Sequence, residues 1–283
     1  MGTPDFAVHS LNALIAHQYE IAAVFTRPDK PRGRGKKITF SPVKSAALAH
    51  DIPVEQPASL KTSDVPEILR GYKPDCIAVA AYGMILPENV LTLPKYGCLN
   101  VHASLLPKYR GAAPINRCIM DGETRSGVTI MQMAKGLDTG DMLLSEKVPI
   151  GENMTASELH NILAELGGKL LVKTLNDIEK LSPMKQDDSA STYAAMLTKA
   201  ECQIDFSRPV KEVYNLIRGL ADYPCAYTFI GNKRVKVYRA VTDFSQTGID
   251  MTCGDGKTIT LTEIQPEGSK RMRTSEFLKG YKE

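Results

Sequence analysis

The sequence predicts an α/β protein in which a mostly parallel sheet domain is followed by a small β-barrel domain. Through the first part of the chain, apolar runs bounded by turn residues alternate with segments of helical periodicity, which is typical of a parallel sheet covered by helices. Toward the C-terminus, short strand-like runs follow one another across glycine turns, which is typical of a small barrel. The length of 283 residues also favours two domains, because single cores usually stop growing near ~250 residues.

Four apolar runs predict strands of the first domain, and four amphipathic stretches interspersed with them predict its helices. The strands are expected at 21–26, 75–82, 97–103 and 127–133, and the helices at 10–18, 41–50, 65–72 and 114–122. The chain itself opens with a turn, Gly2-Thr3-Pro4, and no strand precedes it. Because a sheet of this kind normally begins with a strand, we expect the natural protein to supply one before this turn.

A long amphipathic helix is expected over 155–181, closing the first domain. Thr155 and Glu158 have the spacing of a capping box, and apolar residues recur behind them at helical intervals. The polar segment that follows has weak periodicity, which indicates a linker. The long helix therefore marks the end of the sheet domain.

The second domain is expected to begin with a short helix from Pro209 to Leu220, because proline is well tolerated in a first helical turn. Strands are expected after it at 225–230, 233–241, 248–253 and 257–264. A Gly231-Asn232 turn joins the first two of these strands, as in a hairpin. The predicted organisation is thus a sheet domain at 1–181, a linker at 182–203 and a barrel domain at 204–283.

The composition is that of an ordinary globular protein, with 43% hydrophobic and 24% charged residues. No apolar run approaches the ~20 residues of a membrane span, and the N-terminus lacks the order of a signal peptide, so we expect a cytoplasmic protein without membrane contact. The six cysteines are scattered without a C-x-x-C pair, which favours reduced thiols over zinc or disulfides. The sequence predicts no metal site.

The charge of the chain is concentrated in one loop. Residues 27–44 contain seven Lys or Arg and one Asp, a net charge of +6, whereas the whole chain carries only +3. This imbalance favours a polyanionic partner met at one place. The residues we expect to contact it are Arg32, Arg34, Lys36 and Lys37, which glycines space apart. The alternative is a solvated surface loop, the usual fate of a charge run.

Three polar side chains share one face of the predicted strand 97–103 and its exit. Asn100, His102 and Ser104 are two residues apart, and alternate residues of a strand point the same way. Ligand crevices of open α/β sheets lie at the carboxyl ends of strands. An amide and an imidazolium there can both donate to an oxygen that gains charge in acyl transfer. A satisfied structural Asn and a core His explain the same spacing equally well.

A second loop, Lys135 to Leu144, places Asp138 and Asp141 between glycines after the strand 127–133. A carboxylate beside His102 could hold the ring charged or take a proton from an attacking amine. A plain turn is the alternative, because Asp and Gly are common turn residues. Neither a G-x-S-x-G elbow nor a metal-ligand cluster is present in the sequence, so we expect direct transfer without a covalent intermediate.

Several motifs together resemble the folate-dependent formyltransferases, and among them the methionyl-tRNA formyltransferase family. The resemblance covers nearly the whole chain and rests on "MGTPDFAV", "RPDKPRGRGKK", "AAYGMILP", "LNVHASLLPKYRGAAPI" and "GVTIMQMAKGLDTGDML". It implies a Rossmann-like first domain and a C-terminal barrel of the oligonucleotide-binding (OB) type. Compared with the family pattern, the chain has no strand before Gly2 and is short between Phe244 and Gly248 and at its end, where relatives continue after "FLKGYKE". If these gaps belong to the protein itself, the barrel would be incomplete.

The resemblance also implies a reaction: a formyl group passes from 10-formyltetrahydrofolate to the α-amine of methionyl-initiator tRNA. It matches Asn100, His102 and Asp138 to the catalytic residues, and Ser104, Leu105, Leu106 and Pro107 to the folate-contacting turn. The barrel domain is expected to bind tRNA, and we expect a monomer. Two other functions fit the sequence: formylation of a small amine of the glycinamide ribonucleotide type, and a non-catalytic RNA-binding module.

Overall fold

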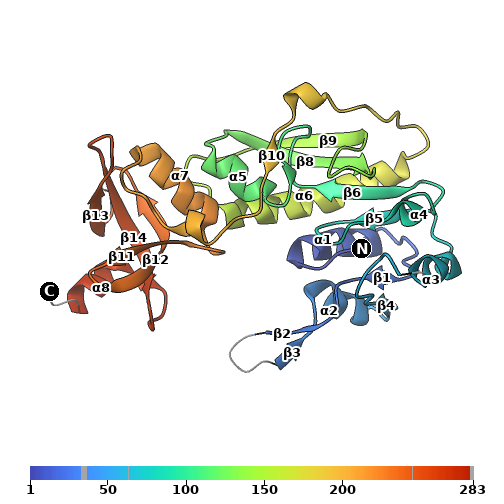
Figure 1. Ribbon diagram of the computed structural model, residues 1–283, viewed down its shortest axis with the longest axis horizontal. Helices are drawn as coiled ribbons and strands as arrows, with labels where there is room; N and C mark the ends of the chain where they lie inside the picture. The colour runs from blue at the N-terminus through green and yellow to red at the C-terminus, as the bar shows by residue number, and fades with distance from the viewer. Residues whose placement is uncertain (33–36, 63, 244, 281–283) are drawn as a thin grey trace. The chain divides into compact units, whose positions relative to one another are not determined.

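The computed structural model describes residues 1–32, 37–62, 64–243 and 245–280 (Figure 1). By its contacts the chain forms two compact units. Unit 1 comprises Met1–Arg110, Gly127–Lys147 and Asn161–Tyr193, and unit 2 comprises Gly111–Ser126, Val148–His160 and Ala194–Glu283. Each unit is therefore assembled from three segments. The boundaries expected from the sequence, at 181 and 204, stay a prediction.

The described helices and strands follow the expected α/β order, with several additional short elements. The helices are α1 (Asp5–Ala16), α2 (Pro42–Leu48), α3 (Val65–Tyr72), α4 (Glu88–Leu91), α5 (Pro114–Met120), α6 (Ala156–Asn176), α7 (Val210–Leu220) and α8 (Thr274–Gly280), with 3-10 turns η1 (Asp188–Ala190) and η2 (Ala200–Cys202). The strands are β1 (Val24–Phe25), β2 (Lys30–Arg32), β3 (Lys37–Thr39), β4 (Val54–Glu55), β5 (Ile77–Val79), β6 (Cys98–His102), β7 (Arg110–Gly111), β8 (Arg125–Gln132), β9 (Met142–Pro149), β10 (Tyr193–Ala194), β11 (Ala226–Ile230), β12 (Lys233–Val241), β13 (Ile249–Thr252), β14 (Thr258–Pro266) and β15 (Met272–Arg273).

The main sheet of unit 1 has the order β5-β6-β8-β9, and β5 and β6 are parallel as expected. The strand expected at 127–133 is β8, which runs antiparallel to β6, and β9 lies beyond it at the edge of the sheet. A separate parallel pair, β1 and β4, lies beyond β5. Gly2 joins the two groups: it forms a parallel bridge with Ala80, and its N–H donates to the carbonyl of Phe25 at 3.0 Å.

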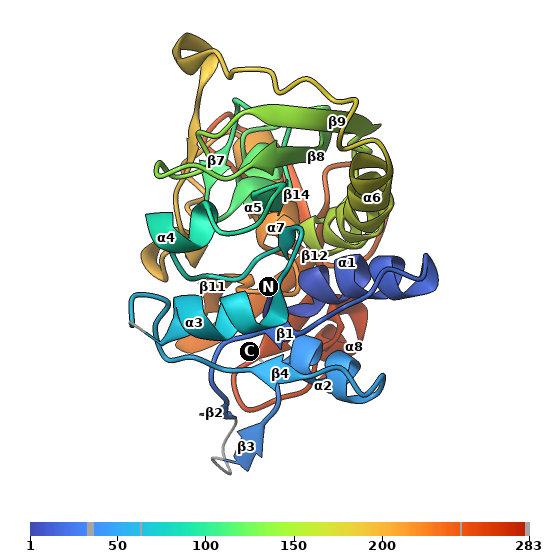
Figure 2. The ribbon, with the colours of Figure 1, turned by 90° about the vertical axis from the view of Figure 1, so that its right-hand side faces the viewer.

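Helix α6 packs against β6 because its sequence combines a firm start with two small residues. The expected capping box is confirmed: the Thr155 N–H donates to Glu158 Oε2 at 2.8 Å. Gly167 and Gly168 let the backbone approach its neighbours, since a Cβ at Gly167 would lie 2.7 Å from Cγ1 of Val101 and one at Gly168 would lie 2.9 Å from the carbonyl of His9. Figure 2 shows α6 and α1 next to each other. This packing fixes the back of the strand that carries Asn100 and His102.

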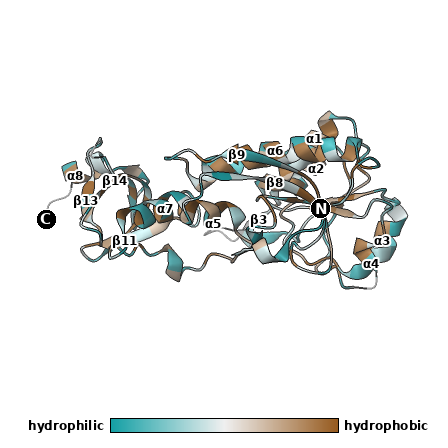
Figure 3. Ribbon diagram, turned by 90° about the horizontal axis from the view of Figure 1, so that it is seen from above, coloured by the Kyte–Doolittle hydropathy of each residue, from teal (hydrophilic) through white to brown (hydrophobic). Residues whose placement is uncertain are grey.

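Unit 2 contains a curled antiparallel sheet, a half-barrel, with the order β11-β12-β14-β13, and helix α7 covers its core. Among the described residues of this sheet, β11 and β13 are the free ends of the path and do not pair with each other. Helix α7 buries Val213, Ile217 and Leu220 and carries polar residues on its other side (Figure 3). The predicted antiparallel strands are therefore confirmed, in a sheet that curls without closing.

Helix α5, which the sequence places among the helices of the first domain, packs within unit 2 against α7. Gly219 allows this close approach, because a Cβ there would lie 2.6 Å from Cγ of Met120. The side chain of Asn116 donates to the carbonyl of Gly219 at 2.7 Å. The small Gly219 and the hydrogen bond from Asn116 thus hold α5 against α7 in unit 2.

Part of the predicted linker is held by one ion pair. Arg117 Nη1 lies 2.6 Å from Oε1 of Glu201, and Arg117 Nε donates to the carbonyl of Ala195 at 3.1 Å. Hydrogen bonds from Arg117 and from the backbone of Thr198 lower the pKa of Glu201 from 4.5 to about 2. The contact stabilises unit 2 wherever Glu201 is ionised.

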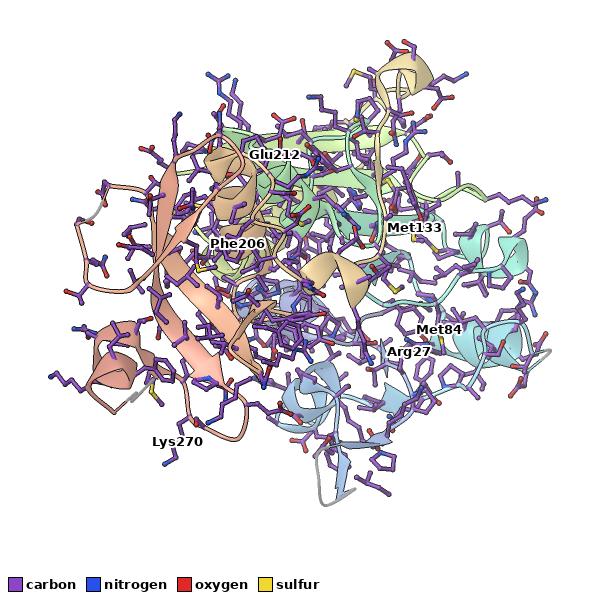
Figure 4. The ribbon with its side chains drawn as sticks, turned by 60° about the vertical axis from the view of Figure 1, so that its left-hand side comes forward. Arg27, Met84, Met133, Phe206, Glu212 and Lys270 are labelled. Carbon is purple, nitrogen blue, oxygen red and sulfur yellow. The ribbon has the colours of Figure 1, made fainter. Side chains whose placement is uncertain are left out.

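We expect this stabilisation to be lost in acid. Because the pKa of Glu201 is lower in the folded chain than its ordinary value, its contribution is complete above about pH 4.5 and falls as pH drops toward 2. Glu201→Gln should remove that part of the pH dependence, measured as the unfolding midpoint between pH 7 and pH 3. Glu212 is a matched control, since it is exposed on α7 (Figure 4). An equal loss of pH dependence in Glu212→Gln would contradict the assignment.

All six cysteines are free thiols, as the sequence predicts. Burial raises the pKa of Cys98 to about 12 and that of Cys118 to about 11, so neither is a reactive thiolate near neutral pH. None of the helices in the described ranges combines the length and the apolar character that crossing a bilayer requires.

Candidate active site

Strand β6 carries the two residues at the centre of the candidate site. Asn100 and His102 are two positions apart on β6 and so project to the same side. Asn100 is half-buried, whereas His102 is only 5% exposed. Their partners across the antiparallel ladder are Met131 and Thr129 of β8. Both side chains thus lie toward the carboxyl end of β6, beside the buried residues Thr129 and Met131 of β8.

The ring of His102 lies between two acceptors. Nε2 donates to the carbonyl of Tyr109 at 2.9 Å, and Nδ1 lies 3.6 Å from Oδ2 of Asp138. A neutral ring carries an N–H on one nitrogen only, whereas the imidazolium carries one on each. The distance of 3.6 Å between Nδ1 and Asp138 is too long for a hydrogen bond, so no hydrogen bond to Asp138 engages Nδ1.

The loop between β8 and β9 brings Asp138 to these residues, as the sequence predicts. Nδ2 of Asn100 donates to Oδ1 of Asp138 at 3.3 Å. Asp138 has a positive φ of 52°, a conformation that Asp tolerates better than most residues. Gly140 packs on the preceding strand so closely that a Cβ there would lie 1.7 Å from the carbonyl of Gln132. The glycine is required for the loop to turn back and present the carboxylate.

A side chain that the sequence analysis missed supports this loop. Nε2 of Gln186 donates to the carbonyls of Asp138 at 2.8 Å and Gly140 at 2.7 Å. Its Oε1 accepts from Nε of Arg110 at 2.9 Å, and Arg110 pairs with Asp188 at 2.7 Å. Arg110 lies within a motif that the sequence singled out, but nothing in the spacing of Gln186 connects it with a loop some fifty residues earlier.

We expect Gln186→Ala to lower turnover by about tenfold while leaving the affinity for the substrates nearly unchanged. The reason is positional: without the two hydrogen bonds, Asp138 loses its fixed distance to Asn100 and His102, and a misplacement of about 1 Å can cost about 10²-fold in rate. Steady-state kinetics separate the two parameters. Gln186→Glu keeps the length but removes the donors, so it should behave like Gln186→Ala; normal turnover in both variants would exclude a positioning role.

The turn after β6 is tightly organised. Ser104 is 1% exposed, and its Oγ donates to the carbonyl of Lys108 at 2.6 Å. Thr129 Oγ1 donates to the carbonyl of Ser104 and accepts from the N–H of Leu106. Leu106 is buried, while Leu105 and Pro107 are partly exposed. Ser104, which shares the face of Asn100 and His102 in the sequence pattern, thus serves to shape the turn.

Two of the four residues expected to contact a polyanion, Arg32 and Lys37, lie on the hairpin of β2 and β3. In its backbone register Arg32 pairs with Lys37, while Arg34 and Lys36 lie outside the described residues. Arg27 follows β1, and its side chain reaches the backbone after β5: a Cβ at Gly83 would lie 3.5 Å from its Nη1. Figure 4 shows Arg27 and Met84 near one another. The end of β1 therefore adds an exposed cation to this part of unit 1.

No group of three or more His, Cys, Asp and Glu side chains that could hold a metal ion occurs in the described ranges. The His102 and Asp138 pair, with an amide as its third member, is better suited to donating and moving protons than to binding a cation. The arrangement can polarise an acyl oxygen and accept a proton in the same place.

Comparison with known proteins agrees with this chemistry. Residues 1–175 match the family model described as formyl transferase, and residues 196–282 match the formyl transferase C-terminal domain. Methionyl-tRNA formyltransferase of Clostridium novyi (strain NT) is 48% identical over 296 residues, covering 99% of this chain and 95% of the relative. The protein of the same name from Geobacter sulfurreducens is 45% identical over 295 residues, covering 100% of this chain and 93% of the relative.

Solved structures share the fold at lower identity. A sugar 3N-formyl transferase has a TM-score of 0.67 at 22% identity, covering 95% of this chain and 97% of that one. Methionyl-tRNA formyltransferase from Clostridium thermocellum has a TM-score of 0.57 at 19% identity, covering 76% and 86%. Together with the high identity of the full-length relatives, these matches lead to one conclusion. The chain belongs to the formyl transferase family, among the methionyl-tRNA formyltransferases.

Proposed function

We propose that this enzyme transfers a formyl group from 10-formyltetrahydrofolate to the α-amine of methionyl-initiator tRNA, for translation initiation. The observation that carries the proposal is the meeting of Asn100, His102 and Asp138, with Asp138 Oδ1 at 3.3 Å from the Asn100 amide and Oδ2 at 3.6 Å from His102 Nδ1. Two donors and one carboxylate around one point are what formyl transfer to an amine requires.

Asn100 and His102 serve the oxygen of the formyl group in this proposal. When the amine attacks the formyl carbon, the carbonyl oxygen gains negative charge, and the Nδ2–H of Asn100 and the Nδ1–H of His102 donate to it. The carbonyl of Tyr109 holds the opposite nitrogen of the ring at 2.9 Å, so the ring keeps its orientation during the reaction. Donors fixed in advance are effective because they need no reorganisation as the charge develops.

Asp138 serves the proton. The attacking amine must lose a proton, and the nitrogen of the donor must gain one as its bond to the formyl carbon breaks. Asp138 accepts the first proton, directly or through a water, and returns it to the leaving nitrogen. Its carboxylate also stabilises the positive charge of His102. One carboxylate thus carries the proton from the attacking amine to the leaving nitrogen of the donor.

The turn of Ser104, Leu105, Leu106 and Pro107 is proposed to contact the folate. Its fit rests on position and shape, because the turn follows directly on His102 and its backbone is fixed through Thr129. The partly exposed Leu105 and Pro107 offer apolar surface against which the flat ring system of a folate can pack. A structure of HypX from Aquifex aeolicus in complex with tetrahydrofolic acid has a TM-score of 0.62 at 17% identity, covering 82% of this chain and 43% of that one.

The acceptor is proposed to be bound through its phosphates. Arg32, Arg34, Lys36 and Lys37 would form a cationic arm for the tRNA, since phosphates attract Lys and Arg whatever the base sequence. The OB-like domain at 204–283 would bind tRNA as well. We propose a cytoplasmic monomer, with the sheet domain at 1–181 holding the catalytic residues.

One assay tests the proposal against its alternatives. The purified protein is given 10-formyltetrahydrofolate with methionyl-tRNA, and in a separate reaction with glycinamide ribonucleotide. We expect formylation of methionyl-tRNA alone. Transfer only to the ribonucleotide would assign the protein to the small-amine enzymes, and transfer to neither, with tRNA still bound, would make it a non-catalytic RNA-binding module.

A further inference from the structure

Unit 2 contains a cavity that shares no residue with the candidate active site. Its volume is about 810 Å³, within the roughly 300–1,000 Å³ that small-molecule pockets occupy. All of its lining residues belong to unit 2, and they come mainly from α7, β12 and β14. Strand β12 shifts its register against β14 between Val237 and Ala240, and a bulge of this kind bends a strand and re-aims its side chains. Residues 238–241 of this bent stretch line the cavity.

Arg218 of α7 is the most deeply buried cation that lines this cavity, with only 7% of its surface exposed. Its Nε donates to Oδ1 of Asn215 at 2.9 Å, and its Nη1 donates to the carbonyls of Met154 at 3.2 Å and Gly151 at 3.4 Å. Nη2 forms no hydrogen bond with any described residue. Burial lowers the pKa of Arg218, and nearby groups such as Glu152 oppose this only in part. The guanidinium is therefore held in place with one nitrogen left for a further acceptor.

The carboxylates closest to the cavity are paired with other cations. Glu263 lines the cavity, but its two oxygens accept from Nε and Nη2 of Arg271 at 2.7 and 2.9 Å. Glu158 pairs with Arg239 at 2.7 Å. Arg218 is thus a buried charge that forms no ion pair within the described ranges, an arrangement that is costly unless an anion joins it.

A second buried polar group lines the same cavity without a partner. Thr262 of β14 is only 7% exposed, and its Oγ1 forms no hydrogen bond with the residues that the structure describes. On the same strand, Oγ1 of Thr260 donates to Oδ1 of Asp250 at 2.6 Å. Because buried hydroxyls nearly always have a partner, Thr262 is a donor that a ligand oxygen would satisfy.

Arg273 of β15 adds a second cation to the lining of the cavity. It is exposed and lies opposite Glu263 in the ladder of β14 and β15, but the carboxylate there is already engaged and Arg273 forms no ion pair with any described residue. Tyr214, Tyr238 and Ile217 contribute aromatic and apolar surface to the same lining. The cavity thus combines two arginines that have no carboxylate partner with walls suited to a ring.

We propose that this cavity binds a small phosphate ester of about nucleotide size, with its phosphate at Nη2 of Arg218, Oγ1 of Thr262 and the guanidinium of Arg273. Two arginines and a hydroxyl match the several oxygens and the double charge of a phosphate better than a carboxylate. The tyrosines pack against the rest of the ligand. An RNA double helix is not the expected occupant, because its phosphates lie on a broad convex surface and cannot approach a guanidinium that is only 7% exposed.

Isothermal titration calorimetry of the full chain tests the proposal, at low ionic strength and without divalent metal. The probes are ATP, inorganic pyrophosphate and adenosine. We expect saturable one-to-one binding of ATP and of pyrophosphate and no binding of adenosine, because the phosphates supply the negative charge that the two arginines lack. ATP should bind more tightly than pyrophosphate, since its sugar and base add contacts with the walls.

Two variants identify the residues that bind the phosphate. Arg273→Ala is expected to weaken ATP binding by about tenfold and Thr262→Val by about fivefold, because each removes a hydrogen bond to the phosphate. The matched control is Lys270→Ala, which should change the affinity by less than about twofold. Lys270 is also an exposed cation, on the loop before β15 (Figure 4), but it does not line the cavity.

Arg218 is followed by NMR in the unaltered protein, because its substitution would also remove buried contacts. Its Nε–H resonance should shift with ATP over the same concentrations as the calorimetric signal. A resonance that does not move, or a lack of saturable ATP binding, would overturn the proposal.

Equal weakening by Arg273→Ala and Lys270→Ala would reveal diffuse electrostatic attraction in place of a site, and would also overturn it. A short RNA duplex with hydroxyl ends is the last competitor. If it displaces ATP, the cavity belongs to an RNA-binding surface and the small-ligand site is wrong. None of these readouts involves formyl transfer, so their outcome is independent of the proposed function.

Discussion

Replacing Asn100 by Ala is expected to lower the turnover of formyl transfer by about 10²–10³-fold. In the proposed site its Nδ2–H donates to the oxygen that gains charge, and loss of one such donor costs about 3–4 kcal/mol in the transition state. Single-turnover formylation of methionyl-tRNA at saturating donor measures the effect directly. Because the interaction strengthens only as charge develops, the affinity for both substrates should change little.

The matched control is Asn89→Ala. Asn89 is exposed on α4 and has no place in the proposed site, so this variant should retain normal turnover. Turnover of Asn100→Ala within about threefold of the unaltered enzyme would remove Asn100 from the catalytic residues. A parallel fall in both variants would point to a general loss of folded protein.

Asp138→Asn is expected to have a still larger effect, a loss of about 10³-fold or more in turnover. An amide has nearly the shape of the carboxylate, but it cannot take the proton of the amine. It also puts a neutral group in place of the carboxylate that lies 3.6 Å from Nδ1 of His102. The same single-turnover assay measures the effect. Amide hydrogen exchange or circular dichroism checks that the variant keeps its fold.

Asp141→Asn is the control from the same loop. The backbone carbonyl of Asp141 accepts from the N–H of Gln132 at 2.8 Å. Among the described residues, the hydrogen bond to Asn100 and the ion pair with His102 come from Asp138, not from Asp141. Its substitution should therefore cost less than about tenfold. If the two variants were equally impaired, the assignment of the proton to Asp138 rather than Asp141 would be wrong.

The sequence predicts the parts of this fold that depend on local pattern. The capping box at Thr155 and the strand with Asn100 and His102 follow from spacing, and both are found where expected. The sequence places Asp138 after the end of a strand, but β8 runs antiparallel to β6, so this end lies beside Leu99 rather than His102. The loop itself therefore brings Asp138 back to His102, which strand order alone does not predict. Their roles in catalysis stay proposals.

Other features depend on contacts between segments far apart in the chain, and the sequence gives no signal for them. The packing of α5 on α7 requires the match between Gly219 and Met120. Strand β8 pairs antiparallel with β6, but its apolar run is compatible with either direction, so the sequence of the strand does not reveal which one it takes. The hydrogen bonds from Gln186 to the loop of Asp138 cannot be predicted for the same reason, since a single glutamine in a polar segment belongs to no periodic pattern.

Gln186 also changes the meaning of the segment that follows α6. A flexible linker between domains tolerates insertions and deletions, because it only has to span the distance between its two ends. In this segment Gln186 donates hydrogen bonds to the carbonyls of Asp138 and Gly140. The length of chain between α6 and residue 186 therefore has to match the distance from α6 to the loop of Asp138. A displacement of the chain after residue 186 would therefore act on the loop of Asp138 through these two hydrogen bonds before it acted on α6.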